Sequence, residues 1–119
     1  MRDHTKLRAF ELADELTLVV YRATRAMPQD ERFGLTMQMR RAAVSTASNI
    51  VEGCARSTHK DYLHFLDMAY GSSRELQYQL SLALRLGFLD AQLQAPVHAL
   101  CVETSKVLNA LICSLREPR

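Results

Sequence analysis

The stretch that decides the fold is Phe33–Arg56, which reads FGLTMQMRRAAVSTASNIVEGCAR. On a helical wheel of about 100° per residue, it predicts a long helix rich in small residues, with two apolar arcs and a narrow polar stripe. The broad arc holds Leu35, Met39, Ala42, Ala43, Thr46, Ile50, Gly53 and Cys54. The second arc holds Met37, Val44 and Val51, each seven residues apart. Because a helix of a monomeric bundle buries only one face, this pattern predicts a helix that is covered twice, once by its own chain and once by a neighbouring copy.

The bulk composition is that of an ordinary globular protein. The chain has 119 residues, of which 48% are hydrophobic and 24% are charged, so we expect one domain over residues 1–119. A net charge of +2 gives little support for a dedicated nucleic-acid binder, which usually has a stronger basic excess. No apolar run reaches the ~20 residues of a membrane span, and the first residues are polar. We therefore expect a cytoplasmic protein with no membrane partner.

The three cysteines contain no CxxC pair. In a cytoplasmic protein they are expected to be free thiols. Free cysteine usually behaves as a small, buried apolar residue, and we expect this of all three.

The remaining sequence predicts three further helices and no strand, which gives an all-α fold. The expected helices cover residues 6–26, 34–55, 58–86 and 91–115. Pro28 ends the first helix, Thr58 (or the serine before it) caps the third, Gly87 ends the third, and Asp90 caps the fourth. Pro96 is expected in the first turn of the fourth helix, or else it splits off a short preceding turn. Short connections favour an antiparallel up-down-up-down four-helix bundle.

Five polar residues lie within or beside apolar stripes: Arg40, Arg41, Asn49, Glu52 and Glu75. Charged groups that are removed from water need partners. Arg41 and Glu52 are eleven residues apart, about 16 Å along one helix, which is too far for a direct pair. We expect Arg40 or Arg41 to meet Glu52 or Glu75 on another helix or another subunit, with recognition of an external partner as the alternative. The candidate subunit interface or polar network comprises Met37, Arg40, Arg41, Val44, Asn49, Val51, Glu52 and Glu75.

Glu52 and Glu75 are also the only candidate acid pair for a hydrolase. No nucleophile, phosphate-binding glycine loop or triad accompanies them in the sequence. The histidines and cysteines lack the spacing of a closed metal site. We therefore expect no enzymatic activity, no catalytic residues, no cofactor and no metal.

A small basic and aromatic patch is the candidate nucleic-acid contact. It consists of Lys60, Arg74, Tyr78 and Arg85 on the third helix. Aromatic rings interleaved with cations are typical of surfaces that bind single strands. Asp67 lies among these residues, however, so an ordinary solvated face is the alternative.

Three segments resemble a known family. Residues 33–45 (FGLTMQMRRAAVS), 48–53 (SNIVEG) and 69–76 (AYGSSREL) look like the signature of four-helix-bundle proteins encoded in intervening sequences of bacterial 23S rRNA genes. The accessory variability determinants of diversity-generating retroelements are similar. Thr46-Ala47 stands where isoleucine-proline is common in that family, so the resemblance does not predict a helix kink at this point.

The resemblance implies a four-helix bundle that assembles into a homopentameric barrel. It also implies an RNA or a nucleic-acid-handling protein as partner, because the retroelement relatives use a basic barrel surface in this way. Two functions follow as hypotheses. The first is a non-enzymatic, RNA- or nucleoprotein-associated accessory module, and the alternative is an oligomeric scaffold for a protein partner with no nucleic-acid role.

Overall fold

The computed structural model describes residues 2–116 and is all-α over that range. Four long helices account for most of it: α1 (Arg8–Ala23), α2 (Leu35–Cys54), α3 (His59–Arg85) and α4 (Ala91–Arg116). Single 3₁₀ turns lie before α1 (η1, His4–Lys6) and between α1 and α2 (η2, Thr24–Ala26, and η3, Gln29–Glu31). The four expected helices are therefore present, although the first begins and ends two to three residues inside its expected bounds of 6–26.

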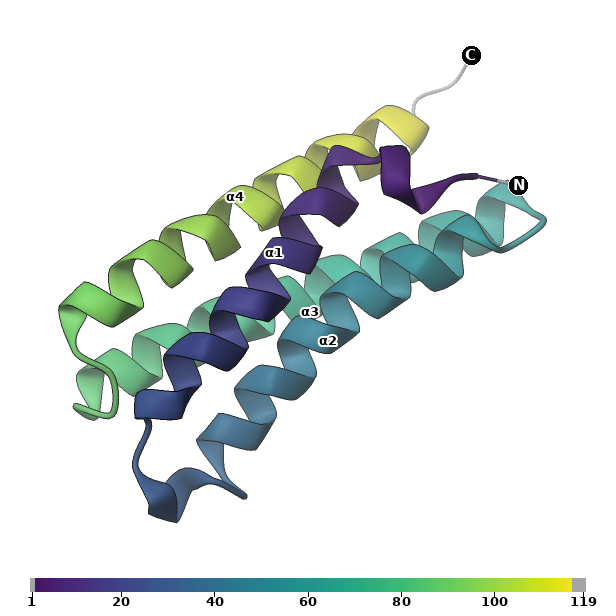
Figure 1. Cartoon of the computed structure of the whole chain (residues 1–119). Coiled ribbons are helices and arrows are strands. Elements are labelled where there is room, and N and C mark those ends of the chain that lie inside the picture. The colour runs from purple at the N-terminus through teal and green to yellow at the C-terminus, as the bar shows by residue number, and fades with distance from the viewer. Residues whose placement is uncertain (1, 117–119) are drawn as a thin grey trace.

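The four helices lie side by side along an elongated body of 48 × 21 × 19 Å (Figure 1). Helices α1 and α3 each pack against both α2 and α4, so every helix has two neighbours. The chain enters α1 and leaves α4 at the same end of the bundle (Figure 1). The most extensive contact is between α2 and α3.

Local signals fix the helix starts as the sequence predicts. The Thr58 hydroxyl accepts a hydrogen bond from the Asp61 backbone N–H at 3.1 Å. The Asp90 carboxylate accepts one from the Leu93 N–H at 2.9 Å. Each cap satisfies one of the N–H groups that the first turn of a helix leaves without a partner.

The end of α3 is set by Gly87, whose φ is +74°. The Phe88 N–H donates to the Ala83 carbonyl at 2.9 Å, and the Gly87 N–H donates to the Leu84 carbonyl at 3.0 Å. This pair of bonds is a Schellman motif, which requires a left-handed residue where glycine is favoured. The predicted stop is therefore confirmed.

Pro96 corrects an expectation. It is neither in the first turn of α4 nor the end of a separate turn, because α4 runs unbroken from Ala91 through it. The ring removes one N–H from the second turn. Tertiary contacts hold that turn in place: Val97 is buried, and the buried Gln94 side chain donates to the Leu80 carbonyl at 3.1 Å.

Small residues allow α2 and α3 to approach closely. A Cβ atom added at Gly53 would lie 3.0 Å from the Phe65 Cβ, so only glycine fits there without a shift. Farther along, the Ser45 and Ser72 hydroxyls are 2.8 Å apart across the same contact. The small side chains between residues 42 and 53 therefore serve tight packing, as the sequence predicts.

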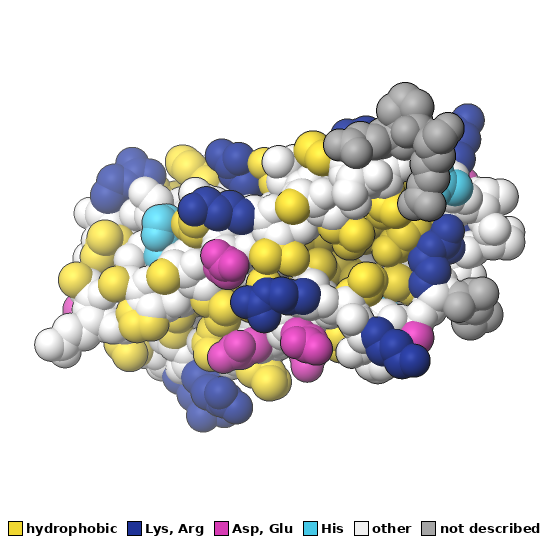
Figure 2. All heavy atoms as spheres, turned by 90° about the horizontal axis from the view of Figure 1, so that it is seen from above, with side chains coloured by type: hydrophobic (Ala, Val, Ile, Leu, Met, Phe, Trp, Pro, Cys, Tyr) yellow, Lys and Arg dark blue, Asp and Glu magenta, His cyan; other side chains and the backbone are white. Residues whose placement is uncertain are grey.

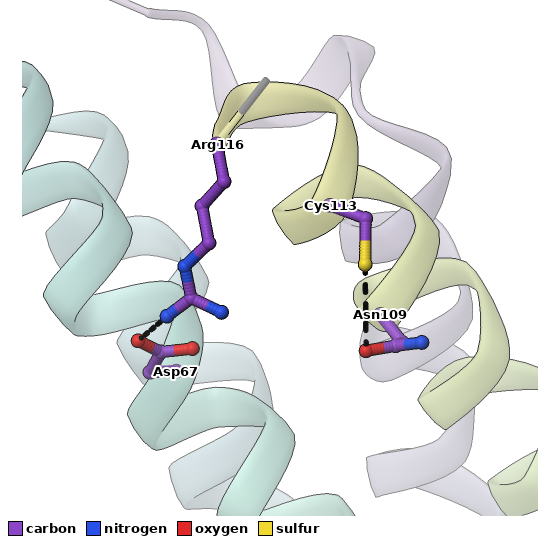
Figure 3. Close-up of polar contacts among 4 residues, drawn as sticks. All are labelled: Asp67, Asn109, Cys113 and Arg116. Atoms are coloured by element: carbon purple, nitrogen blue, oxygen red, sulfur yellow. Dashed lines mark hydrogen bonds and ion pairs between the residues drawn. The ribbon is translucent and has the colours of Figure 1, made fainter. Parts of the chain in front are cut away.

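Two of the three cysteines are buried as expected, and one is not. Cys54 and Cys101 lie in the core, whereas Cys113 is exposed on α4. It lies one residue after Ile112 and five after Leu108 of the buried stripe, which turns it toward solvent, where it contacts Asn109 at 4.0 Å (Figure 3). No helix in residues 2–116 is long and apolar enough to cross a membrane.

Candidate functional site

A groove of about 580 Å³ lies between α1 and α2 and is here called the α1–α2 groove. It is lined by Tyr21, Arg32, Phe33, Met37, Arg40, Arg41, Val44, Ser45 and Ser48. Four of these are large apolar or aromatic side chains that stay exposed, and Phe33 at its end is 73% exposed. Apolar side chains gathered on one face of a protein mark an interaction surface.

The groove exists because the second apolar arc of α2 turns away from the core. Met37 and Val44 are exposed, and Val51 is half-buried. On α1, Leu18 and Tyr21 are three residues apart, lie off the buried stripe and are also exposed. Of these two, Tyr21 lines the groove together with Met37 and Val44.

Arg40 is held at the groove by uncharged partners. Its Nε donates to the Thr24 hydroxyl at 2.9 Å, and its guanidinium lies 4.9 Å from the centre of the Tyr21 ring. Arg32 similarly lies 4.6 Å from the centre of the Phe33 ring. Cation–π contacts of this kind orient a guanidinium without neutralising it, so its charge stays available to a partner.

The expected ion pairs of Arg40 and Arg41 do not form within the chain. In residues 2–116 a single ion pair is present, between Asp67 on α3 and Arg116 on α4 (Figure 3). Glu52 and Glu75 are both exposed. The sequence left two kinds of partner open for Arg40 and Arg41, an acid on another helix of this chain or an acid on another subunit. Within the described residues, no acid on another helix pairs with either arginine.

Asn49 forms its hydrogen bonds within α2 and takes part in no charge network of the described chain. Its amide donates to the Ser45 carbonyl at 2.9 Å and to the Ser45 hydroxyl at 3.0 Å. These bonds lie within one helical turn. Asn49 therefore has partners without a second copy.

The candidate nucleic-acid residues are brought together only in part. Arg85 lies 5.9 Å from the centre of the Tyr78 ring, which is 61% exposed. Arg74 and Tyr78 line a shallow pocket of about 290 Å³ with His98 of α4. Lys60 is 25 residues before Arg85 on the same helix, about 37 Å away, so it does not belong to this patch as expected.

Asp67 does not oppose that patch as the sequence suggested. It lies seven residues before Arg74 on α3, and its carboxylate is bonded to the guanidinium of Arg116 on α4 (Figure 3). Seen from above, the surface elsewhere carries Lys and Arg side chains beside Asp and Glu side chains, with apolar side chains between them (Figure 2). Basic charge therefore does not dominate that face.

Sequence reasoning missed the α1 side of the groove and Arg32. Leu18 and Tyr21 lie outside the main buried stripe of α1, and their spacing of three residues was the available signal. Arg32 and Phe33 lie before α2 begins, where helical periodicity carries no information. Only the path of the connection places them at the groove.

The groups whose pKa values are raised are members of the core. Burial raises the pKa of the Cys101 thiol to about 12. Burial also raises the pKa of Cys54 and of Tyr62, which lie side by side. A thiol kept protonated is a poor nucleophile. In residues 2–116 no three His, Cys, Asp or Glu side chains converge as metal ligands would.

Comparison with known proteins identifies a similar structure and the family of this chain. The structure is similar to the crystal structure of a protein of unknown function of the S23 ribosomal protein family from Bacteroides thetaiotaomicron, with a TM-score of 0.81 and 19% identity. The alignment covers 87% of this chain and 97% of that one. No curated protein matches the chain. The profile of the family described as 23S rRNA-intervening sequence protein matches residues 5–110. The chain belongs to the 23S rRNA-intervening sequence protein family.

Proposed function

We propose that this protein is a non-enzymatic, homo-oligomeric four-helix bundle whose copies meet through the α1–α2 groove. The observation that carries the proposal is the exposed apolar outer face of α2, with Met37 and Val44 at its centre and Tyr21 beside them. Covering such a face removes apolar surface from water, which is the main favourable term in protein association.

Charge complementarity supports a second copy as the occupant. The groove is lined by three arginines and by no carboxylate. Glu52 and Glu75 are exposed elsewhere on the same chain and have no ion-pair partner within the described residues. A contact between different surfaces of two copies is heterologous, and it closes into a ring when the rotation between copies allows.

The finer form of the assembly is part of the proposal. We infer an antiparallel up-down-up-down bundle, which is supported by the entry and exit of the chain at one end (Figure 1) and by the pairing of each helix with two neighbours. A ring of five copies follows from the family resemblance. A cytoplasmic location is supported by three cysteines that form no disulfide.

The experiment uses charge reversal on the full chain. Arg41→Glu and Glu75→Arg are each expected to lower the mass measured by light scattering, because each places like charges at the contact. Combining Arg41→Glu and Glu75→Arg in one chain is expected to restore assembly, since the reversed charges then meet at every contact between copies. A matched control is Glu103→Arg on the exposed side of α4, which should keep the wild-type mass. A wild-type protein that is monomeric at micromolar concentration would contradict the proposal.

A second candidate function is an accessory role with RNA. The family description names an intervening sequence of 23S rRNA, and the patch of Arg74, Tyr78 and Arg85 supplies cations around an exposed ring. Base stacking on such a ring contributes roughly 1–3 kcal/mol per base. The alternative is an oligomeric scaffold for a protein partner, for which the apolar groove itself is the argument.

The two roles differ in their salt dependence. Phosphate contacts release counterions, so RNA binding through two or three cations should weaken steeply as salt rises. Fluorescence anisotropy with a structured RNA and with a single-stranded RNA measures this. Tyr78→Ala should weaken binding, while Tyr21→Ala on the other face should not. If no RNA binding is detected even at low salt, the scaffold role is the better explanation.

A further inference from the structure

A second, smaller pocket lies where the connection from α1 meets the start of α2, and the proposed assembly does not use most of it. Its volume is about 160 Å³, and we call it the 24–40 pocket. Its lining includes Thr24, Arg25, Arg32, Thr36 and Arg40. Arg25 and Thr36 line this pocket and not the α1–α2 groove.

Positive charge collects in this pocket without an opposing carboxylate. Three arginines line it, no acidic residue does, and none of the three forms an ion pair in residues 2–116. The acid nearest in sequence, Glu31, is already engaged, because its Oε1 accepts the Leu35 N–H at 3.0 Å. Like charges gathered at one site repel each other until an anion joins them.

Unused hydrogen-bond donors face the same region. Thr36 is only 6% exposed, yet its hydroxyl has no hydrogen-bond partner. The Thr36 backbone N–H lies in the first turn of α2, directly after the Leu35 N–H that Glu31 caps, and within the described chain it has no acceptor. Buried hydroxyls nearly always have partners, and the first turn of a helix attracts anions.

We propose that the 24–40 pocket binds a tetrahedral oxyanion of the phosphate class. The lining arginines and Thr36 come from the η2 turn, the connection before α2 and α2 itself, and a phosphate presents acceptor oxygens in several directions. A volume of about 160 Å³ is roughly that of five liquid waters, which is enough for a phosphate group. The pocket shares Arg32 and Arg40 with the α1–α2 groove, whereas Arg25 and Thr36 belong to the pocket alone. Its phosphate comes either from free inorganic phosphate or from a nucleic-acid backbone.

The test is calorimetric titration of the full chain with sodium phosphate at fixed ionic strength. We expect saturable binding with a dissociation constant in the millimolar range or below. Arg25→Gln and Thr36→Val should each raise that constant by about fivefold or more, the loss typical of one charge-assisted or buried hydrogen bond. The matched control is Arg22→Gln, which removes the same charge from an exposed position of α1 outside the pocket.

Thermal unfolding gives a second readout that a merely structural role would not produce. Without phosphate, Thr36→Val should keep or raise the melting temperature, because it removes a buried hydroxyl that has no partner. With phosphate, the same variant should lose most of the ligand-induced rise that the wild type shows. A hydroxyl with only a packing role would leave that rise unchanged.

The result that would overturn the proposal is an absence of saturable phosphate binding to the wild type, or an equal loss in Arg22→Gln and Arg25→Gln. The source of the phosphate is resolved by repeating the titration with a short single-stranded RNA. An equal loss of RNA affinity in Arg25→Gln and Thr36→Val assigns the site to a nucleic-acid backbone. A loss for inorganic phosphate alone assigns it to a small anion. The mass from light scattering, measured in parallel, shows whether the assembly itself is intact.

Discussion

Replacing Val44 by glutamate is the sharpest single perturbation of the proposed interface. Val44 lies in the α1–α2 groove and is 40% exposed. Because full burial of a valine side chain contributes about 1.5–3 kcal/mol, covering the exposed part of Val44 contributes about 1 kcal/mol per contact. The substitution removes this term.

The new carboxylate adds a second and larger cost. It lies three and four residues from Arg41 and Arg40, so it competes for the charges that we assign to the neighbouring copy. It also repels the neighbour's acidic residues and must leave water on assembly, which costs several kcal/mol for an unpaired charge. We expect a total loss of at least about 3 kcal/mol, or more than about a hundredfold in the dissociation constant of each contact.

The assay is size-exclusion chromatography with light scattering at micromolar protein. The variant should elute as a folded monomer, because glutamate is a good helix former at a position that is exposed in the single chain. Leu93→Glu is the matched control, since Leu93 is 41% exposed but lies on α4 outside the groove. A Val44→Glu protein with wild-type mass, or a Leu93→Glu protein that dissociates to the same extent, would refute the reasoning.

Three further predictions concern the fold. Gly87→Ala should lower the free energy of unfolding by about 1–2 kcal/mol in urea titration, because φ of +74° disfavours any residue with a Cβ; an unchanged midpoint would contradict the Schellman assignment. Ser73→Ala should cost about 1–3 kcal/mol, because it leaves the buried Ser105 hydroxyl without its 2.8 Å partner. A double Ser73→Ala, Ser105→Ala variant should cost less than the sum of the two single losses. Since burial raises the pKa of the Cys101 thiol from 9.0 to about 12, the folded state holds this proton more tightly than the unfolded state. Its contribution to stability is complete below pH 9.0 and is lost as the pH rises toward about 12. Cys101→Ala should lose this part of the alkaline dependence, and in the native wild type a thiol reagent should modify the exposed Cys113 before Cys101.

Local chemistry made the helix boundaries predictable from sequence. Thr58 and Asp90 cap the helices that follow them, and Gly87 ends α3, because each of these effects is complete within one turn of chain. The doubly apolar character of α2 was predictable for the same reason, since helical period alone sorts its residues into arcs. Met37 and Val44 are exposed on the second arc accordingly.

Contacts between two different helices or turns were harder to predict from the sequence. The sequence identified Arg40 as a charge in need of a partner, but the partners it has, Thr24 and Tyr21, lie across a turn on α1. Grouping Lys60 with Arg85 was wrong, because residues that share a helix side can lie at opposite ends of it.

The sequence by itself determined four amphipathic helices and an α2 with a spare apolar arc, since these depend on spacings of three, four and seven residues. It also determined the caps of α3 and α4, which form within one turn of chain. Only the tertiary structure decided what lies opposite each helix face. It places Tyr21 of α1 beside the outer face of α2 in the α1–α2 groove, and the path of the η2 and η3 turns brings Arg25, Arg32 and Arg40 around one pocket. Such juxtapositions arise from packing among distant segments, and no local rule of the chain encodes them.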